Sequence, residues 1–310
     1  MRNQIEFGDC REIMRKWKEQ GVKAQTCVTS PPYFGLRDYG HDGQIGLEET
    51  PEEYIAAMVE VFRCVWDVLE DDGTLWLNIG DSYSGSGKGR NADGSHQEGG
   101  KQGTNKGTIE GSLIKTNAPN CKPKDLIGIP WMLAFALRAD GWYLRQDIIW
   151  HKPNPMPESV QDRCTKAHEY IFLLSKQQKY YYDIESIKDP VKQDWGTRDR
   201  TDGKYHNEGS GLTPHSGLEK SYEMANKRSV WSVNTKPYKG AHFAVFPQEL
   251  IEPCIMAGAP KDGIVLDPFM GSGTTAQVAQ NLGRQYLGCE LNPEYAPLQA
   301  ERTKQYSLGI

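Results

Sequence analysis

Residues 263–275 read GIVLDPFMGSGTT and predict a buried strand, a glycine-rich turn and the start of a helix. Gly271 and Gly273 allow the backbone to approach a ligand at the helix N-terminus, where unpaired N–H groups face outward. The turn is not a Walker phosphate loop, because no lysine follows its second glycine. A strand at 285–289 then ends at Glu290, where a dinucleotide-binding fold places the carboxylate that holds ribose hydroxyls. We therefore expect a nucleoside site, with a purely structural turn as the alternative.

Residues 29–33 read TSPPY and follow an apolar run that predicts the end of a buried strand. Pro31 and Pro32 lack backbone N–H groups and have restricted φ angles, so the strand must stop and a stiff loop begins. The loop presents the Ser30 hydroxyl, two backbone carbonyls and the Tyr33 ring. These groups suit a planar base that carries an exocyclic amino group, with the amine on the oxygens and the base on the ring. Taken alone, the five residues fit a rigid turn with a half-buried aromatic side chain.

Length and composition describe a globular α/β protein. The chain has 310 residues, of which 25% are charged and 10% aromatic. It has no run of 18 apolar residues and no signal-peptide pattern, so we expect no membrane span and a cytoplasmic location. Its seven cysteines include no C-x-x-C pair. That spacing argues against a disulfide framework and a structural zinc site, and we expect reduced cysteines and no metal.

The formal net charge is −5, but the positive charge is concentrated in two segments. Residues 84–124 carry seven Lys or Arg against three Asp or Glu, and residues 188–239 carry ten against seven. An acidic body with two basic segments is a reasonable electrostatic footprint for DNA binding. Ordinary solvated loops are the alternative.

The first eighty residues have the alternation of an α/β sheet. Residues 4–7 predict a short strand, and Asp9 is placed to cap the helix that follows. In residues 51–69, apolar side chains recur three and four positions apart, which predicts an amphipathic helix with Pro51 at its start. A strand at 74–79 follows. Strand, helix and strand in this order predict a parallel sheet with helices on its faces.

The middle of the chain combines strands with irregular segments. Residues 143–150 and 168–175 predict strands, and residues 180–182 follow closely enough to pair with the second as a hairpin. Residues 84–120 are rich in Gly, Ser, Asn and Lys, and predict a long mobile loop. Residues 177–240 interleave aromatic with basic residues and have little periodicity, which suits a surface that reads bases and phosphates.

The two runs together resemble the amino-methylating DNA methyltransferases, in which a D-P-F-x-G-x-G-T-T turn contacts S-adenosylmethionine and a [DNS]-P-P-[YFW] loop holds a flipped base. The catalytic loop comes first here and the cofactor turn last, as in the beta class. The resemblance covers most of the chain, and the long segment 84–120 departs from the family pattern. It implies a Rossmann-like, seven-stranded methyltransferase sheet of the α/β class, circularly rearranged, with a terminal hairpin.

The resemblance also implies a division of the chain. Residues 1–176 would form the catalytic half of one methyltransferase domain, with the mobile loop at 84–120. Residues 177–240 would form the target-recognition segment, and residues 241–310 the cofactor half of the same domain. Residues 241–247 resemble the family's segment before the cofactor turn, and residues 147–153 resemble a strand at the wall of the base pocket.

Individual roles follow from the same resemblance. The catalytic residues would be Ser30, Pro31, Pro32 and Tyr33. The cofactor would be bound by Asp9, Thr29, Phe246, Asp267, Pro268, Phe269, Gly271, Gly273, Thr274 and Glu290. The basic charge of residues 84–124 predicts DNA contacts by Lys88, Arg90, Lys101 and Lys106, and the resemblance adds Lys152 at the wall of the base pocket. The partners implied are double-stranded DNA, a second copy of the chain in a homodimer and a cognate restriction endonuclease, in a prokaryotic cell or a phage-infected host.

The expected reaction moves a methyl group from S-adenosylmethionine to the exocyclic N4 of a flipped cytosine. A serine at the first loop position is commoner in cytosine N4 enzymes of the family, but adenine N6 remains an alternative. A ring-carbon methyltransferase would need a nucleophilic cysteine, and Cys254, the one cysteine that follows a proline, lies in an apolar helical stretch. Two further alternatives are an inactive DNA-binding protein with the same fold and a methyltransferase acting on RNA or protein.

Overall fold

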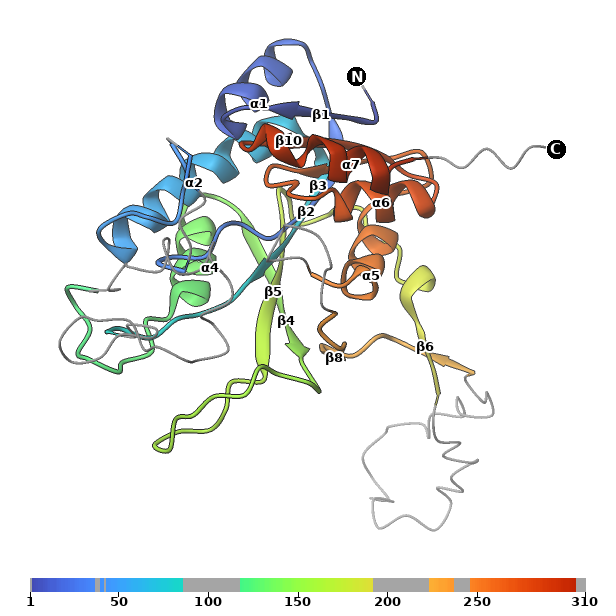
Figure 1. Ribbon diagram of the computed structural model, residues 1–310. Coiled ribbons are helices and arrows are strands. Elements are labelled where there is room, and N and C mark those ends of the chain that lie inside the picture. Colours follow the sequence, from blue (N-terminus) through green and yellow to red (C-terminus); the bar gives the residue numbers. More distant parts are fainter. Residues whose placement is uncertain are drawn as a thin grey trace, which may run out of the picture.

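The computed structural model describes residues 2–36, 40–41, 43–85, 118–191, 223–236 and 246–304. Its main sheet is built from β1 (Gln4–Phe7), β2 (Ala24–Thr29), β3 (Leu69–Ile79), β4 (Tyr143–His151), β5 (His168–Ser175), β8 (Val230–Ser232), β9 (Ile264–Asp267) and β10 (Gln285–Glu290). These eight strands lie in the order β1-β10-β9-β2-β3-β5-β4-β8. Figure 1 shows β1 and β10 at one end of the sheet and β4 and β8 at the other. Both ends of the chain therefore supply strands to one sheet, with β2 and β9 paired near its centre.

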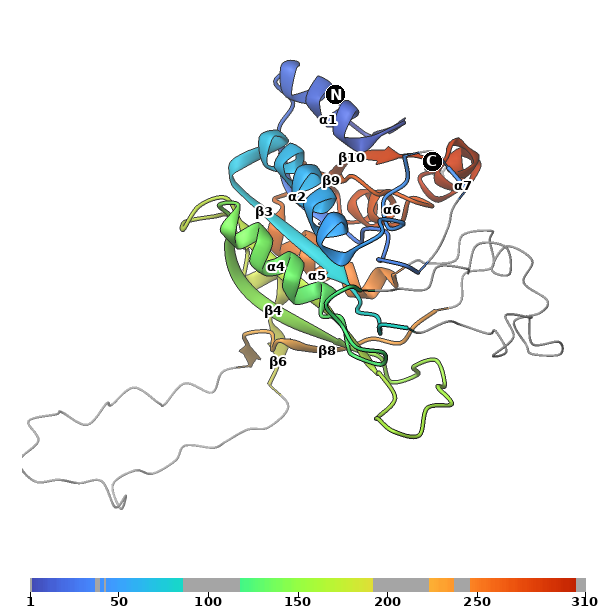
Figure 2. The ribbon, with the colours of Figure 1, turned by 90° about the vertical axis from the view of Figure 1, so that its left-hand side faces the viewer.

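Helices cover both faces of the sheet (Figure 2). One face carries α1 (Cys10–Glu19), α2 (Pro51–Val68) and α4 (Ile129–Ala139), and the other carries α5 (Gln248–Gly258) and α6 (Thr274–Asn281), with α7 (Ala296–Arg302) packed on α6. Two single-turn 3₁₀ helices, η1 (Glu185–Ile187) and η2 (Pro293–Tyr295), and a separate ribbon of β6 (Asp189–Pro190) and β7 (Met224–Ala225) complete the described elements. The Rossmann-like methyltransferase sheet predicted from the sequence is confirmed.

The central strands are buried on both faces because helices cover both. Along β2, Cys27 packs into the core under α1 and α2, and the next residue, Val28, packs into the core under α5 and α6. Both side chains are almost fully buried. This alternation follows from the two-residue repeat of a strand. It explains why β2 reads as an apolar run in the sequence.

The sequence specifies α2 at its start as well as along its length. The Thr50 hydroxyl accepts a hydrogen bond from the backbone N–H of Glu53 at 3.1 Å. The Glu53 carboxylate accepts one from the backbone N–H of Thr50 at 3.2 Å, which completes a capping box. Pro51 occupies the first turn, where its missing N–H costs nothing. The predicted amphipathic helix at 51–69 is confirmed, with Val68 as its last residue.

The strand directions gather the ends of many strands at one edge of the sheet. β1, β10, β9, β2 and β3 run parallel to one another, and β5 runs antiparallel to both of its neighbours, β3 and β4. The carboxyl ends of β1, β2, β3, β4, β9 and β10 therefore lie at the same edge as the first residues of β5. Open α/β sheets bind their ligands at this edge.

Two expectations need correction. The sheet has eight strands rather than seven, because β8 pairs in parallel with β4 at the sheet's end. The hairpin forms between β4 and β5, and residues 180–182 are not a strand. Tyr182 instead stacks on Trp76 with ring centroids 6.1 Å apart. Three aromatic side chains in a row resemble a strand in sequence, but here Tyr180 and Tyr182 pack against the core beside the sheet.

Three other features concern the cysteines, membrane-spanning helices and metal ligands. All seven cysteines are free thiols. Across the described residues, no helix is long and apolar enough to cross a membrane. In that same part of the chain, no group of three or more His, Cys, Asp or Glu side chains is arranged to hold a metal ion. Most of the predicted mobile loop, residues 86–117, lies outside the described residues.

Gly258 allows α5 to lie directly on the sheet. A Cβ atom at this position would lie 2.6 Å from Thr26 Oγ1 and 2.8 Å from Trp76 Nε1. We expect Gly258→Ala to lower the free energy of unfolding by about 1–3 kcal/mol, because overpacking forces buried neighbours apart. Urea unfolding measures the loss. Glu252→Ala, on the same helix and partly exposed, should change stability by less than about 0.5 kcal/mol. Equal effects of the two substitutions would contradict this account.

Candidate active site

A cavity of about 740 Å³ opens at the carboxyl edge of the sheet. Its walls include the loop after β2, the turn after β9, the end of β10, the segment that follows β4 and the start of β5. The lining residues that matter most for its chemistry are Ser30, Tyr33, Lys152, Glu169, Phe269 and Glu290. The structure thus brings together residues from the first thirty positions and residues near 290.

The buried carboxylate of Asp267 joins the two predicted motifs. Its Oδ1 accepts a hydrogen bond from the Thr29 hydroxyl at 2.6 Å, and its Oδ2 accepts one from the Thr275 hydroxyl at 2.6 Å. The backbone N–H of Phe269 donates to Oδ1 at 3.0 Å. All three donors lie within the joint between β2, β9 and α6, so the carboxylate fixes the position of the TSPPY loop relative to the glycine-rich turn.

Asp267 has little contact with solvent, and its side chain does not line the cavity. Burial raises the pKa of this carboxyl to about 6, against the lowering effect of its three hydrogen bonds. The residue therefore supports the glycine-rich turn without lining the cavity. Thr29, Gly273 and Thr274, which were also predicted to bind the cofactor, are likewise buried and do not line the cavity.

Glu290 is the acidic residue that faces the cavity from β10. The backbone N–H of Gly271 donates to its Oε2 at 2.7 Å, and the backbone N–H of Asn292 donates to its Oε1 at 2.8 Å. These bonds hold the glycine-rich turn against the end of β10. Burial raises the pKa of the carboxyl above its ordinary value. Each oxygen can accept a further bond, so the side chain can bind a hydroxyl while it supports the turn.

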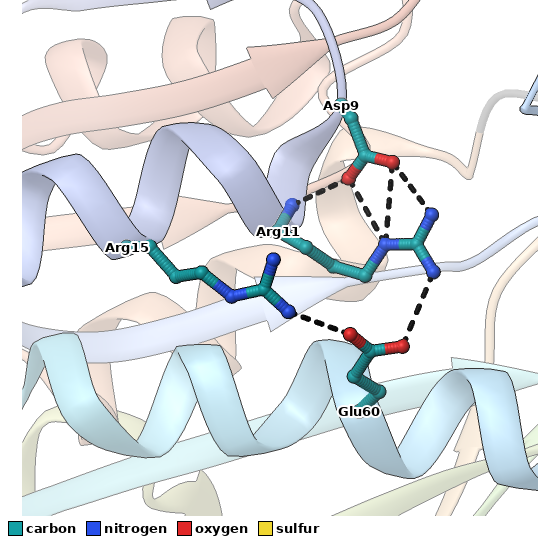
Figure 3. A network of polar contacts seen from close by, with 4 residues as sticks. All are labelled: Asp9, Arg11, Arg15 and Glu60. Atoms are coloured by element: carbon teal, nitrogen blue, oxygen red, sulfur yellow. Dashed lines mark hydrogen bonds and ion pairs between the residues drawn. The ribbon is translucent and has the colours of Figure 1, made fainter.

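Asp9 lines the cavity beside the start of α1. Its carboxylate caps α1 through the backbone N–H of Arg11 at 2.8 Å and pairs with the Arg11 guanidinium at 2.6 Å (Figure 3). Arg11 and Arg15 both contact Glu60 of α2, at 3.3 and 2.6 Å. The pair with Arg11 lowers the pKa of Asp9. Asp9 is thus a negative charge held at the cavity edge by a network between two helices.

Phe246, Pro268, Phe269 and Gly271 complete the predicted cofactor residues on the cavity wall. Phe246 packs against the core under α5, and Phe269 packs against the core on the opposite side of the sheet. The wall therefore combines apolar rings with the carboxylate of Glu290. Such a mixture of apolar surface and a few placed polar groups is typical of small-molecule sites.

The TSPPY loop is held in place from α2. Tyr54 is fully buried, and its hydroxyl donates to the Pro32 carbonyl at 2.8 Å. Within the part of the chain that the structure describes, no protein donor contacts the Pro31 carbonyl. Pro31 and Pro32 also line the cavity, beside Ser30. The loop therefore presents a hydroxyl and a carbonyl on a support that Tyr54 fixes.

The Tyr33 ring packs against the sheet, and its hydroxyl contacts the carboxylate of Glu169, a residue that the sequence did not predict to be in the site. Its hydroxyl donates to Glu169 Oε2 at 2.9 Å, and Lys152 forms an ion pair with Glu169 Oε1. Burial, and then the Glu169 carboxylate, raise the pKa of the Tyr33 hydroxyl well above its ordinary value. The ring lies so close to Gly80 that a Cβ there would be 2.7 Å from Tyr33 Cε2. A glycine at 80 therefore permits this placement.

The predicted DNA-binding residues separate into two groups. Lys152 lies on the cavity wall, with its side chain only 17% exposed. Lys88, Arg90, Lys101 and Lys106 lie outside the described residues. Glu169 and Tyr54 are the contributors that sequence reasoning missed. The signal available for Glu169 was its position at the start of a strand, which becomes informative only once the strand is known to run antiparallel.

Asp267 should make stability depend on pH. Its pKa is 3.8 ordinarily and about 6 in the folded protein, so between these values the folded state holds a proton that the unfolded chain has lost. The free energy of unfolding should fall across this window as pH rises, by roughly 3 kcal/mol. Asp267→Asn has no such proton. The stability of wild type minus that of the variant, measured by urea unfolding, should therefore decrease from pH 4 to pH 6 and then level off. A pH-independent difference would contradict the assignment.

Known proteins resemble this chain along most of its length. The family described as DNA methylase, of the N6 and N4 methyltransferases, matches residues 24–302. The type II methyltransferase M.SmaI of Serratia marcescens is 48% identical over 96% of this chain and 89% of its own. The type II methyltransferase M.Cfr9I of Citrobacter freundii is 46% identical over 95% of this chain and 85% of its own.

Two solved structures share the fold. The PvuII DNA methyltransferase, described as cytosine-N4-specific, superposes with a TM-score of 0.62 at 17% identity over 99% of this chain and 88% of its own. A putative DNA modification methylase from Thermus thermophilus, in complex with S-adenosyl-L-methionine, gives 0.57 at 24% identity over 99% and 96%. The match over residues 24–302 and the 48% identity to a type II methyltransferase show that this chain belongs to the DNA methylase family.

Proposed function

We propose that this chain transfers a methyl group from S-adenosylmethionine to the exocyclic N4 of a cytosine flipped out of duplex DNA. One observation carries the proposal: the Thr29 to Asp267 hydrogen bond sets the TSPPY loop beside the glycine-rich turn, so that Ser30 and Glu290 face one cavity. An amine acceptor site and a nucleoside site that share a cavity are what a direct transfer between the two requires.

The cavity suits the cofactor in size and chemistry. Its volume of about 740 Å³ is within the ordinary range for a small-molecule site. Glu290 supplies carboxylate oxygens for ribose hydroxyls, and Phe246 and Phe269 supply apolar surface. S-adenosylmethionine, when bound, supplies a methyl group on a positively charged sulfur. The Thermus thermophilus relative of the fold is complexed with that cofactor.

The TSPPY loop would activate the target amine. The exocyclic nitrogen is a poor nucleophile because its lone pair is delocalised into the ring. Its two N–H groups would donate hydrogen bonds to Ser30 Oγ and to the Pro31 carbonyl. These bonds would favour a pyramidal nitrogen whose lone pair is free to attack. The gain comes from position and local electrostatics. Flipping the base costs a few kcal/mol, which stacking on Tyr33 would offset.

A covalent enzyme intermediate is not part of this proposal. Cys254 is 1% exposed within α5, where its thiol contacts the Leu250 carbonyl, and burial raises the thiol's pKa far above its ordinary value. A buried, protonated thiol is a poor nucleophile. The remaining cysteines are free thiols, and Cys10 is the one that lines the cavity. Its pKa is raised to about 12, chiefly by burial, so it too is protonated at neutral pH.

Cytosine is favoured over adenine by the serine at the first loop position, following the resemblance drawn from the sequence. The same geometry would serve adenine N6, which remains the second candidate because both bases present an exocyclic amine next to a ring nitrogen. The type II relatives suggest a restriction-modification setting with a cognate endonuclease. A homodimer, the cytoplasmic location and the division into residues 1–176, 177–240 and 241–310 stay predictions.

Identification of the product tests the proposal. Purified protein, S-adenosylmethionine and bacterial DNA should yield N4-methylcytosine on nucleoside digestion and mass spectrometry. Ser30→Ala should lower the single-turnover rate about tenfold or more, while cofactor affinity is kept, because the lost acceptor acts on the amine. N6-methyladenine would move the assignment to the second candidate. Cofactor binding without any methylated nucleoside would support the inactive DNA-binding alternative.

Glu290 should govern cofactor affinity. Glu290→Gln keeps an oxygen for one backbone N–H but removes the charge that strengthens a bond to a ribose hydroxyl. A hydrogen bond to a charged group contributes about 1.5–3 kcal/mol, so we expect the dissociation constant for S-adenosylmethionine to rise at least about tenfold in calorimetry. Glu294→Gln, four residues on and exposed, is the matched control. The assignment fails if the two variants bind equally well.

A further inference from the structure

Glu169 occupies a central position in the cavity wall that the proposed function does not use. It is the second residue of β5, and its side chain is only 16% exposed. Its carboxylate meets three other parts of the chain: Tyr33 from the loop after β2, Lys152 from the segment after β4 and Asn78 of β3, whose Nδ2 lies 3.5 Å from Oε2. One carboxylate therefore connects the catalytic loop with the opposite wall.

Lys152 is held in place by two contacts, one of them with Glu169. Its ammonium pairs with Glu169 and lies 4.2 Å from the centroid of the Trp150 ring. That ring is itself held, since its Nε1–H donates to the Val233 carbonyl at 2.8 Å. An ammonium has three donors, and the Glu169 bond uses one of them. Because Lys152 lines the same cavity as Ser30, a further donor is available for a ligand there.

The location of Lys152 suits a base rather than a phosphate. A phosphate of the duplex backbone stays outside a pocket that receives a flipped base. Lys236, another lysine that lines the cavity, is 62% exposed and pairs with Glu249, which is the arrangement of a surface cation. Lys152 is 17% exposed and lies within the wall. Its charge is cancelled by Glu169, so it can donate without adding net repulsion toward a cationic cofactor.

We propose that Lys152 donates a hydrogen bond to ring N3 of the flipped cytosine. Glu169 is then a positioning residue that fixes Lys152 and Tyr33 relative to each other. The inference rests on the proposed function and adds the group that reads the base. N3 is the acceptor next to the amine, so a base whose amine meets Ser30 and Pro31 presents N3 to a neighbouring wall. Thymine and uracil carry N3–H at that position and would face the ammonium with a donor.

Deletion of the acceptor atom tests the contact with Lys152. Duplexes carry either the target cytosine, located by product mapping, or 3-deazacytosine, which has C–H in place of N3. We expect wild type to lose at least about tenfold in kcat/KM on the analogue, the size of one good base contact. Lys152→Met should lose a similar factor on cytosine and almost nothing further on the analogue. If Lys152→Met retains the full wild-type penalty for the analogue, Lys152 does not contact N3 and the inference is overturned.

Glu169→Gln tests the positioning role. The amide keeps the size of the side chain and still accepts from Tyr33, but it no longer neutralises Lys152. We expect kcat/KM to fall about tenfold, mainly through a higher KM for DNA, with a smaller penalty for the analogue than wild type shows. Melting temperature and cofactor affinity should stay near those of wild type. An undiminished penalty in Glu169→Gln would remove Glu169 from the role.

Glu158→Gln is the matched control. Glu158 lies between β4 and β5, on the segment that carries Lys152, and pairs with Arg163 at 2.6 Å, but it does not line the cavity. The control should keep wild-type kinetics on both substrates. The product assay separates the two levels of inference. A product other than N4-methylcytosine overturns the proposed function and this inference together, whereas N4-methylcytosine with independent effects of Lys152→Met and of the analogue overturns this inference alone.

Discussion

The hydrogen bonds of Asp267 are the constraint on which the site depends. Thr29 and Thr275, separated by most of the chain, both donate to this buried carboxylate. Parallel pairing of β2 with β9 brings the strands together, but it leaves the loops that follow them free to point in several directions. The bond to Thr29 selects one direction, so that Ser30 starts its loop beside the glycine-rich turn. Burying these polar groups has a desolvation cost, and the raised pKa of Asp267 reflects it. The hydrogen bonds in turn fix one specific geometry.

The reversed direction of β5 gives the site its second half. A purely parallel sheet would place only strand ends at the ligand edge. Because β5 runs against β3 and β4, its first residues reach that edge, and Glu169 arrives between Tyr33 and Lys152. Short local features support this placement, since the absence of a side chain at Gly80 leaves room for the Tyr33 ring. The cavity thus depends equally on topology and on individual small residues.

The sequence alone predicts what is local and periodic. The helix at 51–69, the strands around positions 27 and 265, and the glycine-rich turn all follow from spacing, prolines and glycines, and the structure confirms them. Contacts between distant residues do not follow in this way. Nothing near Tyr33 indicates that its hydroxyl meets a residue 136 positions away, and nothing near 180–182 shows that these tyrosines pack beside the sheet. Strand order and direction determine such contacts. Neither can be read from local patterns in a single sequence, so the contacts become visible only in the folded structure.

The charges around the cavity complement a cationic cofactor. Asp9 is paired with Arg11, Lys152 with Glu169 and Lys236 with Glu249, so these three pairs contribute little net charge. Glu290 is bonded instead to two backbone N–H groups, which carry no formal charge to balance a carboxylate, and its side chain has low exposure. Burial raises its pKa, and a neighbouring cation would lower it again. Under the proposed function, the carboxylate that holds the ribose therefore also supplies the balancing charge, and cofactor binding relieves part of the cost of burying it.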